Sequence, residues 1–258
     1  MKIIVLMKQV ANKDAVLRIG PDEKWINEAD VSQQTNESDG YALEEALRMK
    51  EAKGDGEVIV CTLGPQSAKT VIKDALARGA DRAIHVIHDQ PNKLSAYQIA
   101  KAIGDAIREE SADLVFTGLQ SDDASYGQTG VVLAELLGIP HATIVIEVDR
   151  TSLNGGLRVK RELESGWYQW FTYQLPALLT IQSGISQIRY ASLKGIMAAK
   201  KKEIREVTPN VDAFVSAATV ERVYMPLKTK QTQMLGNGDA KAGAAELVEK
   251  LKNEVRVL

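Results

Sequence analysis

Short apolar runs alternate with segments of helical periodicity through the first two-thirds of the 258-residue chain. The apolar runs are rich in β-branched residues and have the character of strands buried on both faces: Ile3–Met7, Val58–Leu63, Ala83–Ile87, Leu114–Thr117 and Thr143–Val148. The intervening segments repeat apolar residues every three or four positions, which predicts helices over Tyr41–Lys53, Ser67–Arg78, Leu94–Glu110 and Tyr126–Leu137. This alternation predicts an α/β fold whose mostly parallel sheet is covered by helices on both faces.

The pattern changes after about residue 149. Leu157–Leu163 and Trp167–Tyr173 flank a short polar turn and predict a β-hairpin. Ala177–Gln182 predicts one further strand, and an extended polar arm then leads to a final helix over Ala240–Asn253. We therefore divide the chain into an α/β domain that includes the hairpin, residues 1–207, and a C-terminal arm with its helix, residues 208–258, that docks on the domain or on a partner.

Composition excludes several classes of function. The 32 Lys and Arg residues nearly balance the 34 Asp and Glu residues, so no net charge attracts nucleic acid or an anionic membrane. No apolar run approaches the ~20 residues of a membrane-spanning helix, and we expect no membrane insertion. The single cysteine, Cys61, excludes an internal disulfide and a multi-cysteine metal site. The start Met1–Lys8 resembles a buried strand and not a secretory signal, so we expect a cytoplasmic protein.

The loop from Gly118 to Gly130 is the strongest local signal of binding. It follows a predicted strand, is rich in glycine and hydroxyl groups, and runs directly into a predicted helix. Ligands of parallel sheets bind beyond the carboxyl ends of the strands, and a helix N-terminus offers free backbone N–H groups to a phosphate. The alternative is an unliganded helix start that Asp122 or Ser125 caps.

Two other loops follow strands or precede helices. Residues Thr35–Asp39 read most simply as a helix cap, and Leu63–Pro65 allows a close approach of the backbone, although turn chemistry also explains it. The histidines have no partner at a recognisable catalytic spacing. We expect no catalytic residues and no metal site in this chain.

The segment from Tyr190 to Lys202, here called the docking segment, combines apolar residues with the lysine run Lys200–Lys202. Exposed apolar anchors beside positive charge are typical of a protein contact, in which the apolar residues give affinity and the charge steers the encounter. The alternative is a short helix that packs Ile196 and Met197 inward and leaves the lysines in solvent.

This segment resembles the signature of electron transfer flavoprotein beta subunits. The resemblance covers roughly residues 1–205 in blocks that keep the order of the family: Val5–Val10, Leu43–Leu47, Leu63–Pro65, Arg78–Arg82, Gly118–Gln120, Gln128–Gly130, Arg161–Leu163, Leu175–Ala177, Arg189–Leu193 and Gly195–Met197. It implies a Rossmann-like fold and a heterodimer with an alpha subunit that holds most of the FAD. The subunit is then an electron carrier and not an enzyme, which accepts electrons from dehydrogenases and passes them to a membrane quinone oxidoreductase.

The resemblance also implies site residues. A structural AMP would contact Leu6, Asn36, Glu37, Ser38, Asp39, Leu63, Gly118, Gln120, Ser121, Asp122, Asp123, Ala124, Ser125, Tyr126, Gly127, Gln128 and Thr129. Glu162 matches a family glutamate near the flavin. A partner dehydrogenase would contact Tyr190, Ala191, Ser192, Leu193, Lys194, Gly195, Ile196, Met197, Lys200, Lys201 and Lys202, with Leu193 as the anchor in a hydrophobic pocket.

The chain departs from the family in both nucleotide loops. Asn36 is followed by Glu37-Ser38-Asp39 where many members have proline and an apolar residue, and Ser121-Asp122 replaces the alanine and isoleucine that are common elsewhere. Relatives that hold a second FAD and split electron pairs tend to end the second loop in glutamine-valine-glycine-proline, whereas Gln128-Thr129-Gly130 resembles the AMP type. The alternatives are such an electron-bifurcating subunit, whose complex oxidises NADH, and a stand-alone ATP-binding or ATP-cleaving protein.

Overall fold

The computed structural model describes residues 1–150, 156–211, 219–227 and 232–257. The chain forms two compact units, Met1–Val223 and Tyr224–Leu258. The second unit contains the C-terminal helix α6 (Ala240–Lys250), which a π-helical turn continues over Leu251–Val255. This confirms the predicted final helix. The boundary after residue 207 stays a prediction.

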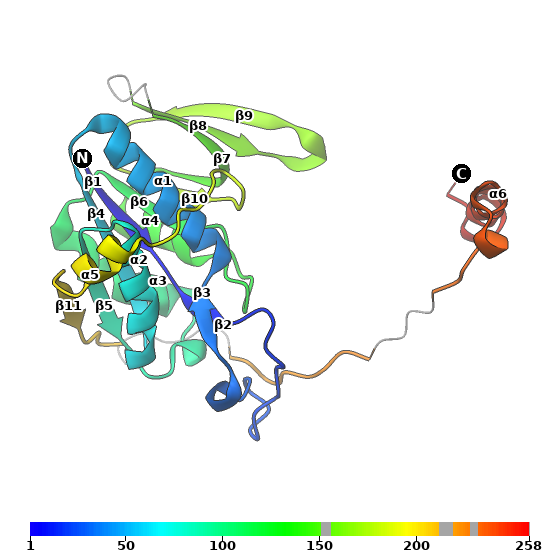
Figure 1. Cartoon of the computed structure of the whole chain (residues 1–258), viewed down its shortest axis with the longest axis horizontal. Helices are drawn as coiled ribbons and strands as arrows, with labels where there is room; N and C mark the ends of the chain where they lie inside the picture. The colour runs from blue at the N-terminus through cyan, green and yellow to red at the C-terminus, as the bar shows by residue number, and fades with distance from the viewer. Residues whose placement is uncertain (151–155, 212–218, 228–231, 258) are drawn as a thin grey trace. The chain divides into compact units, whose positions relative to one another are not determined.

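A nine-stranded sheet is the centre of the first unit (Figure 1). Its spatial order is β11-β5-β4-β1-β6-β10-β7-β8-β9, and all neighbours are parallel except at β7–β8 and β8–β9. The strands are β1 (Lys2–Leu6), β4 (Glu57–Gly64), β5 (Arg82–Ile87), β6 (Leu114–Gly118), β7 (His141–Asp149), β8 (Leu157–Glu162), β9 (Tyr168–Tyr173), β10 (Ala177–Ile181) and β11 (Ile204–Val207). The predicted α/β fold with its hairpin is confirmed.

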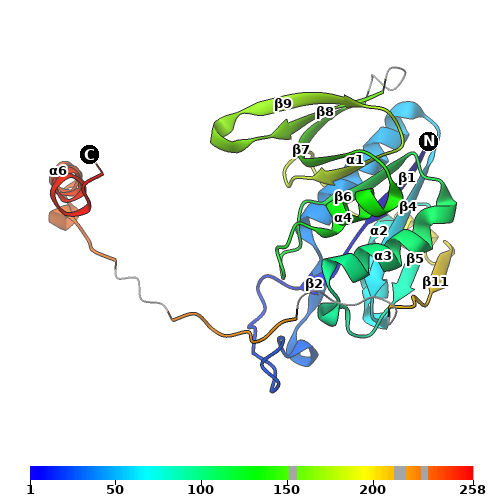
Figure 2. The same cartoon turned by 180° about the vertical axis from the view of Figure 1, so that it is seen from behind.

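Helices cover both faces of the parallel part of the sheet. In Figure 1, α1 (Glu37–Lys53) and α2 (Lys69–Arg78) lie on the near face, and the reverse view in Figure 2 shows α3 (Ala96–Ile107) and α4 (Thr129–Leu137) on the other. Side chains of β1 alternate between the two cores: Ile3 and Val5 pack with α1, whereas Ile4 and Leu6 pack with α3. Because both sets are apolar, the strand carries no polar alternation, as its sequence predicted.

Two details differ from the sequence prediction. We expected β7 to be buried on both faces, but Glu147 is exposed, because the sheet passes here into the antiparallel hairpin. Three short elements were not predicted: β11, and the antiparallel pair of β2 (Gln9–Ala11) and β3 (Gln33–Thr35).

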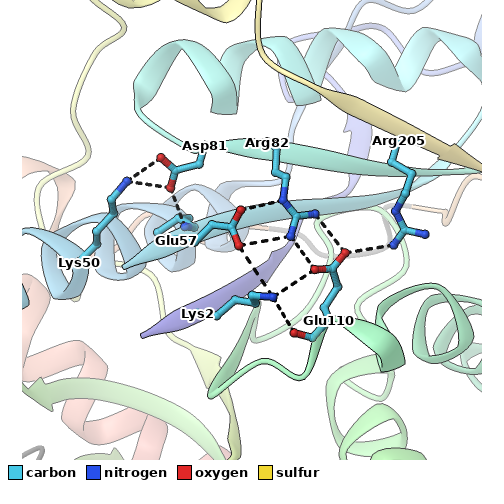
Figure 3. A network of polar contacts seen from close by, with 8 residues as sticks. Lys2, Lys50, Glu57, Asp81, Arg82, Glu110 and Arg205 are labelled. Carbon is cyan, nitrogen blue, oxygen red and sulfur yellow. Dashed lines mark hydrogen bonds and ion pairs between the residues drawn. The ribbon is translucent and has the colours of Figure 1, made fainter. Parts of the chain in front are cut away.

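The amino-terminal edge of the sheet carries an ion-pair network, here called the amino-edge network (Figure 3). The guanidinium group of Arg82 binds Glu57 at 2.7 Å and Glu110 at 2.5 Å. Glu110 also accepts from Lys2 at 3.5 Å and from Arg205 at 3.3 Å. The network therefore ties the starts of β1, β4 and β5 to the end of α3 and to the edge strand β11.

Candidate functional site

A cleft opens where the order of the parallel strands reverses. From β1 the chain continues to β4 and β5 on one side, whereas β6 pairs with β1 on the other side. The loops that follow β1 and β6 must therefore diverge, and ligands of open α/β sheets bind in the crevice between such loops. The cleft is lined by Leu6–Lys8 after β1 and by Gly118–Ser121 after β6.

Most residues of the predicted AMP site line this cleft. They are Leu6, Asn36, Asp39, Leu63, Gly118, Gln120, Ser121, Ala124, Tyr126, Gly127, Gln128 and Thr129. The other predicted residues, Glu37, Ser38, Asp122, Asp123 and Ser125, are not part of the lining but belong to the same loops and hold their shape. The structure thus brings together loops that lie more than eighty residues apart in the sequence.

Asn36 links residues 35–39 to the loop that begins at Gly118. We expected residues 35–39 to cap a helix, but the side chain of Asn36 makes no capping hydrogen bond to α1. Its amide instead donates to the Gln120 carbonyl at 2.9 Å, and its Oδ1 accepts from the Asp122 backbone N–H at 2.9 Å. Ser38 Oγ also donates to the Gln120 carbonyl at 2.8 Å. Because these groups are buried or half-buried, their hydrogen bonds fix the second loop against the start of α1.

Asp39 fixes the strand ends behind the cleft. Its carboxylate accepts from the Lys8 backbone N–H at 2.7 Å and from the Gly118 backbone N–H at 3.0 Å. Burial raises the pKa of this carboxyl group to about 7, although the two N–H donors act in the opposite direction. Asp39 is thus a buried acid that joins β1, β6 and α1 at one point.

Two glycines allow the second loop to take its course. A Cβ atom on Gly118 would overlap Ser38 Oγ and the carboxylate of Asp39, so only glycine permits this close approach. Gly127 has a φ of 61°, in the left-handed region that favours glycine. It immediately precedes Gln128 and the start of α4, where no side chain caps the helix. The backbone N–H groups at this helix start are available to an anion.

Lys8 places an ammonium group at the cleft, where Asp123 pairs with it. Its ammonium group contacts Asp123 Oδ1 at 2.6 Å and Ser121 Oγ at 3.4 Å. We did not assign Lys8 to the site from the sequence, and we also missed Trp25 and Val220, which line the cleft. Only the position of Lys8 directly after β1 gave a usable signal, because Trp25 and Val220 come from loops whose location the tertiary structure determines.

The docking segment forms the short helix α5 (Leu193–Ala199), which Ser192 caps by accepting from the Gly195 backbone N–H. Tyr190 and Leu193 are 96% and 78% exposed, and Ile196 and Met197 are also exposed, so the inward-packing alternative is wrong. Lys200 and Lys201 are exposed, whereas the Lys202 ammonium donates to the carbonyls of Leu76 and Ala80 at the end of α2. Ala191 and Lys194 complete the segment, half-buried and exposed respectively.

Arg189 holds the start of the docking segment on α1. Its guanidinium group binds Glu44 at 2.9 Å and Glu51 at 2.5 Å. The Arg189 guanidinium and backbone N–H, together with Arg48, keep the pKa of Glu44 below its usual value despite the opposing effect of burial. Glu162, the predicted flavin neighbour, ends β8 on the hairpin and does not line the cleft.

Comparison with known proteins identifies the family. A family profile described as "Electron transfer flavoprotein domain" matches residues 24–212. An "Electron transfer flavoprotein subunit beta" from Methylophilus methylotrophus is 36% identical over 245 residues, which cover 92% of this chain and 93% of that protein. The chain belongs to the electron transfer flavoprotein beta subunits.

Other beta subunits match over comparable lengths. The "Electron transfer flavoprotein subunit beta, mitochondrial" of Oryza sativa subsp. indica is 37% identical over the whole of both chains. The beta subunit of Homo sapiens is 34% identical over 81% of this chain and 82% of that protein. Membership of this family assigns the chain to electron transfer and implies an alpha subunit as its partner.

In the part of the chain that the structure describes, no helix has the length and apolar character needed to cross a bilayer. Within the same residues, no group of three or more His, Cys, Asp or Glu side chains is arranged to hold a metal ion.

Proposed function

We propose that this beta subunit binds a structural AMP in the cleft and supports the FAD that its alpha subunit mainly holds. The observation that carries the proposal is the meeting of three loops at the strand reversal, where Leu6, Leu63 and the loop that begins at Gly118 surround one cavity. Leu6 and Leu63 offer apolar contacts to a base. The start of α4 offers backbone N–H groups to a phosphate, and the Lys8 ammonium, paired with Asp123, lies at the same cleft.

The residues present fit a mononucleotide. A phosphate needs donors that are not already paired, and α4 begins without a side-chain cap. Asn36, Ser38 and Asp39 fix the surrounding backbone before the ligand arrives, which lowers the entropic cost of binding. AMP takes no part in a reaction here. Because it binds the folded subunit, it raises the free energy of unfolding as its concentration rises above its dissociation constant.

The subunit carries electrons as part of the complex and is not itself an enzyme. A dehydrogenase reduces the flavin, which then passes electrons to a membrane quinone oxidoreductase. The docking segment binds the dehydrogenase, with Leu193 as the apolar anchor. Glu162 lies near the flavin in the assembled complex. The cytoplasmic location stays a prediction.

The native complex tests this proposal. We expect a companion polypeptide, one FAD and one AMP per heterodimer when the purified complex is denatured and its nucleotides are separated. If the heterodimer contains two FAD molecules and no AMP, the subunit is of the electron-bifurcating type and the AMP proposal is wrong. A chain without any companion or adenine nucleotide would overturn the proposal, and ATP hydrolysis by the chain alone would favour the ATP-cleaving alternative.

Replacement of the anchor tests docking separately. Leu193→Ala removes most of an exposed apolar side chain that becomes buried on docking, so we expect electron transfer from the dehydrogenase to slow by about tenfold or more. Flavin content and reduction of the flavin by dithionite serve as controls and should not change. Unchanged kinetics with the dehydrogenase would exclude Leu193 as the anchor.

A further inference from the structure

The lining of the cleft combines polar and apolar side chains. The loop between β6 and α4 contributes the polar residues Gln120, Ser121 and Gln128. Strands β1 and β4 and helix α3 contribute the apolar residues Leu6, Leu63 and Ile99. A nucleotide has a similar division, because its phosphate is charged and its base presents two apolar faces. We therefore expect apolar residues to contact the base and the loop before α4 to contact the phosphate.

Trp25 adds an aromatic ring to this lining. It lies on the long loop between β2 and β3, and its side chain is half-buried. The indole N–H donates to Glu28 Oε1 at 2.8 Å, so the polar atom of the ring is satisfied within the loop. The backbone of Trp25 is also fixed, because its carbonyl accepts from the Gly20 N–H at 2.7 Å and Ile19 pairs with Ile26. The indole N–H and the backbone of Trp25 are thus both held within the loop.

A second segment holds the Trp25 loop at the cleft. The Val223 backbone N–H donates to the Glu23 carbonyl at 2.8 Å, and the Lys24 ammonium donates to the Glu221 carbonyl. Val220, just before this contact, itself lines the cleft. Glu23 and Lys24 before Trp25 are therefore held by this segment, and Ile26 after it is held by its pairing with Ile19.

We propose that Trp25 is a wall of the base pocket and gives the cleft its affinity for the purine ring of the nucleotide. This inference rests on the proposed binding of AMP in the same cleft. An aromatic ring stacks on the face of a base regardless of the polar groups at the base edge, and such contacts change affinity by about 10- to 100-fold per base. The polar loop before α4 would then hold the ribose and phosphate, so the two ends of the ligand depend on different parts of the chain.

Calorimetry on the nucleotide-depleted heterodimer tests this assignment. The comparison uses wild type, Trp25→Ala and Trp25→Phe, with AMP as the ligand and ribose 5-phosphate, which lacks the base, measured as its competitor. We expect Trp25→Ala to raise the dissociation constant of AMP about 10- to 100-fold, whereas Trp25→Phe should retain most of the affinity. The dissociation constant of ribose 5-phosphate should change less than twofold in both variants. Trp170→Ala, which removes a tryptophan on the hairpin, is the matched control and should bind AMP as wild type does.

The outcomes separate this inference from the function on which it rests. If wild type binds AMP and Trp25→Ala binds it equally well, Trp25 is not a wall of the base pocket. Equal weakening of AMP and ribose 5-phosphate would show a general collapse of the cleft and would also overturn the inference. If Trp25→Ala does not fold, Trp25→Leu keeps an apolar side chain without the ring and gives the same test. A wild-type complex that binds no AMP would overturn the proposed function itself.

Discussion

The two edges of the same sheet use their polar groups in opposite ways. At the amino-terminal edge, Arg82 lies between Glu57 and Glu110, and these charges satisfy one another within the amino-edge network (Figure 3). At the carboxyl edge, the loops carry backbone donors at the uncapped start of α4 and surround an open cleft. Strand β1 joins the two edges, with Lys2 in the network and Lys8 at the cleft.

This contrast separates stability from binding. Paired charges at a closed edge stabilise the fold and offer nothing to a ligand, whereas donors at an open edge are satisfied only when a ligand or water arrives. Because a parallel sheet directs all its carboxyl ends to one edge, substitutions at the two edges should have separable effects. The predictions below test that separation.

The largest effect is expected at Gly118. Gly118→Ala places a Cβ atom against Ser38 Oγ and the Asp39 carboxylate, so the loop must move away from α1. We expect a loss of about 3 kcal/mol in the free energy of unfolding and loss of bound nucleotide from the complex, measured by denaturation and by nucleotide analysis. Gly184→Ala is the control, because Gly184 has a φ of 90° but open space around it. This control should lower the free energy of unfolding by about 1 kcal/mol and leave the nucleotide in place. Full nucleotide content in Gly118→Ala would contradict the close approach described here.

Glu110→Gln should act on the other edge alone. It weakens the hydrogen bonds that Glu110 accepts from Arg82, Arg205 and Lys2, and we expect a loss of about 2 kcal/mol in the free energy of unfolding without a change in nucleotide content. Glu109→Gln, which changes the exposed neighbouring residue, should change stability by less than about 0.5 kcal/mol.

The same variant has a defined pH dependence. Hydrogen bonds from Arg82 lower the pKa of Glu110 from 4.5 to about 2. A group whose pKa is lowered by folding stabilises the protein above its unfolded pKa, and that contribution is lost as the pH falls toward the folded pKa. The advantage of wild type over Glu110→Gln should therefore shrink between pH 5 and pH 2. A constant difference across this range would exclude the ionised form of Glu110 as its source.

Asp39 should show the opposite pH dependence. Its folded pKa of about 7 lies above the ordinary value of 3.8, so its contribution to stability is complete below about pH 4 and is lost as the pH rises through 7. Asp39→Asn leaves the position neutral and does not titrate. We expect the stability of wild type relative to Asp39→Asn to fall steadily as the pH rises from 5 to 8 in denaturant titrations. A rise over this interval would mean that the two N–H donors outweigh burial.

The smallest effect concerns the lysine run, where satisfied and unsatisfied charges are neighbours. Lys202 donates to carbonyls at the end of α2, so Lys202→Gln should lower the free energy of unfolding by about 1 kcal/mol and leave the docking rate unchanged. Lys200 is exposed, so Lys200→Gln should reduce the rate of association with the dehydrogenase by about twofold at low salt and less at high salt. Stopped-flow measurements of the association rate at two ionic strengths distinguish the two variants. If both variants had the same rate and the same salt dependence, the contrast between Lys200 and Lys202 would be wrong.

The sequence predicted the central strands and the helices well because their signal is local. Ile3 and Ile4 face different cores, and only a continuous apolar run serves a strand of that kind. The edge strand β11 was missed because its four residues include Arg205 and Glu206, which its position at the edge tolerates. Helix starts were less accurate: α1 begins at Glu37, ahead of the apolar stripe that predicted it from Tyr41.

The site was predictable only where its residues follow strands. The loop from Gly118 lies at the cleft because β6 ends there, and this follows from the topology of a parallel sheet. The role of Asn36 was not predictable, because its partners Gln120 and Asp122 lie 84 and 86 residues away, and a local reading assigns it to a helix cap. Trp25 and Val220 reach the cleft through contacts between two loops, which leave no periodic pattern in the sequence.

The burial of Cys61 has a practical consequence. This residue is the single cysteine of the chain, it lies within β4 with no exposed surface, and burial raises the pKa of its thiol to about 12. The thiolate is the form of cysteine that attacks alkylating reagents, so the native subunit should remain unlabelled by maleimide at neutral pH. A cysteine introduced at an exposed position such as Lys194 would then be the one reactive thiol of this subunit. A fluorophore or spin label attached there would test whether a dehydrogenase docks at this segment, as proposed above.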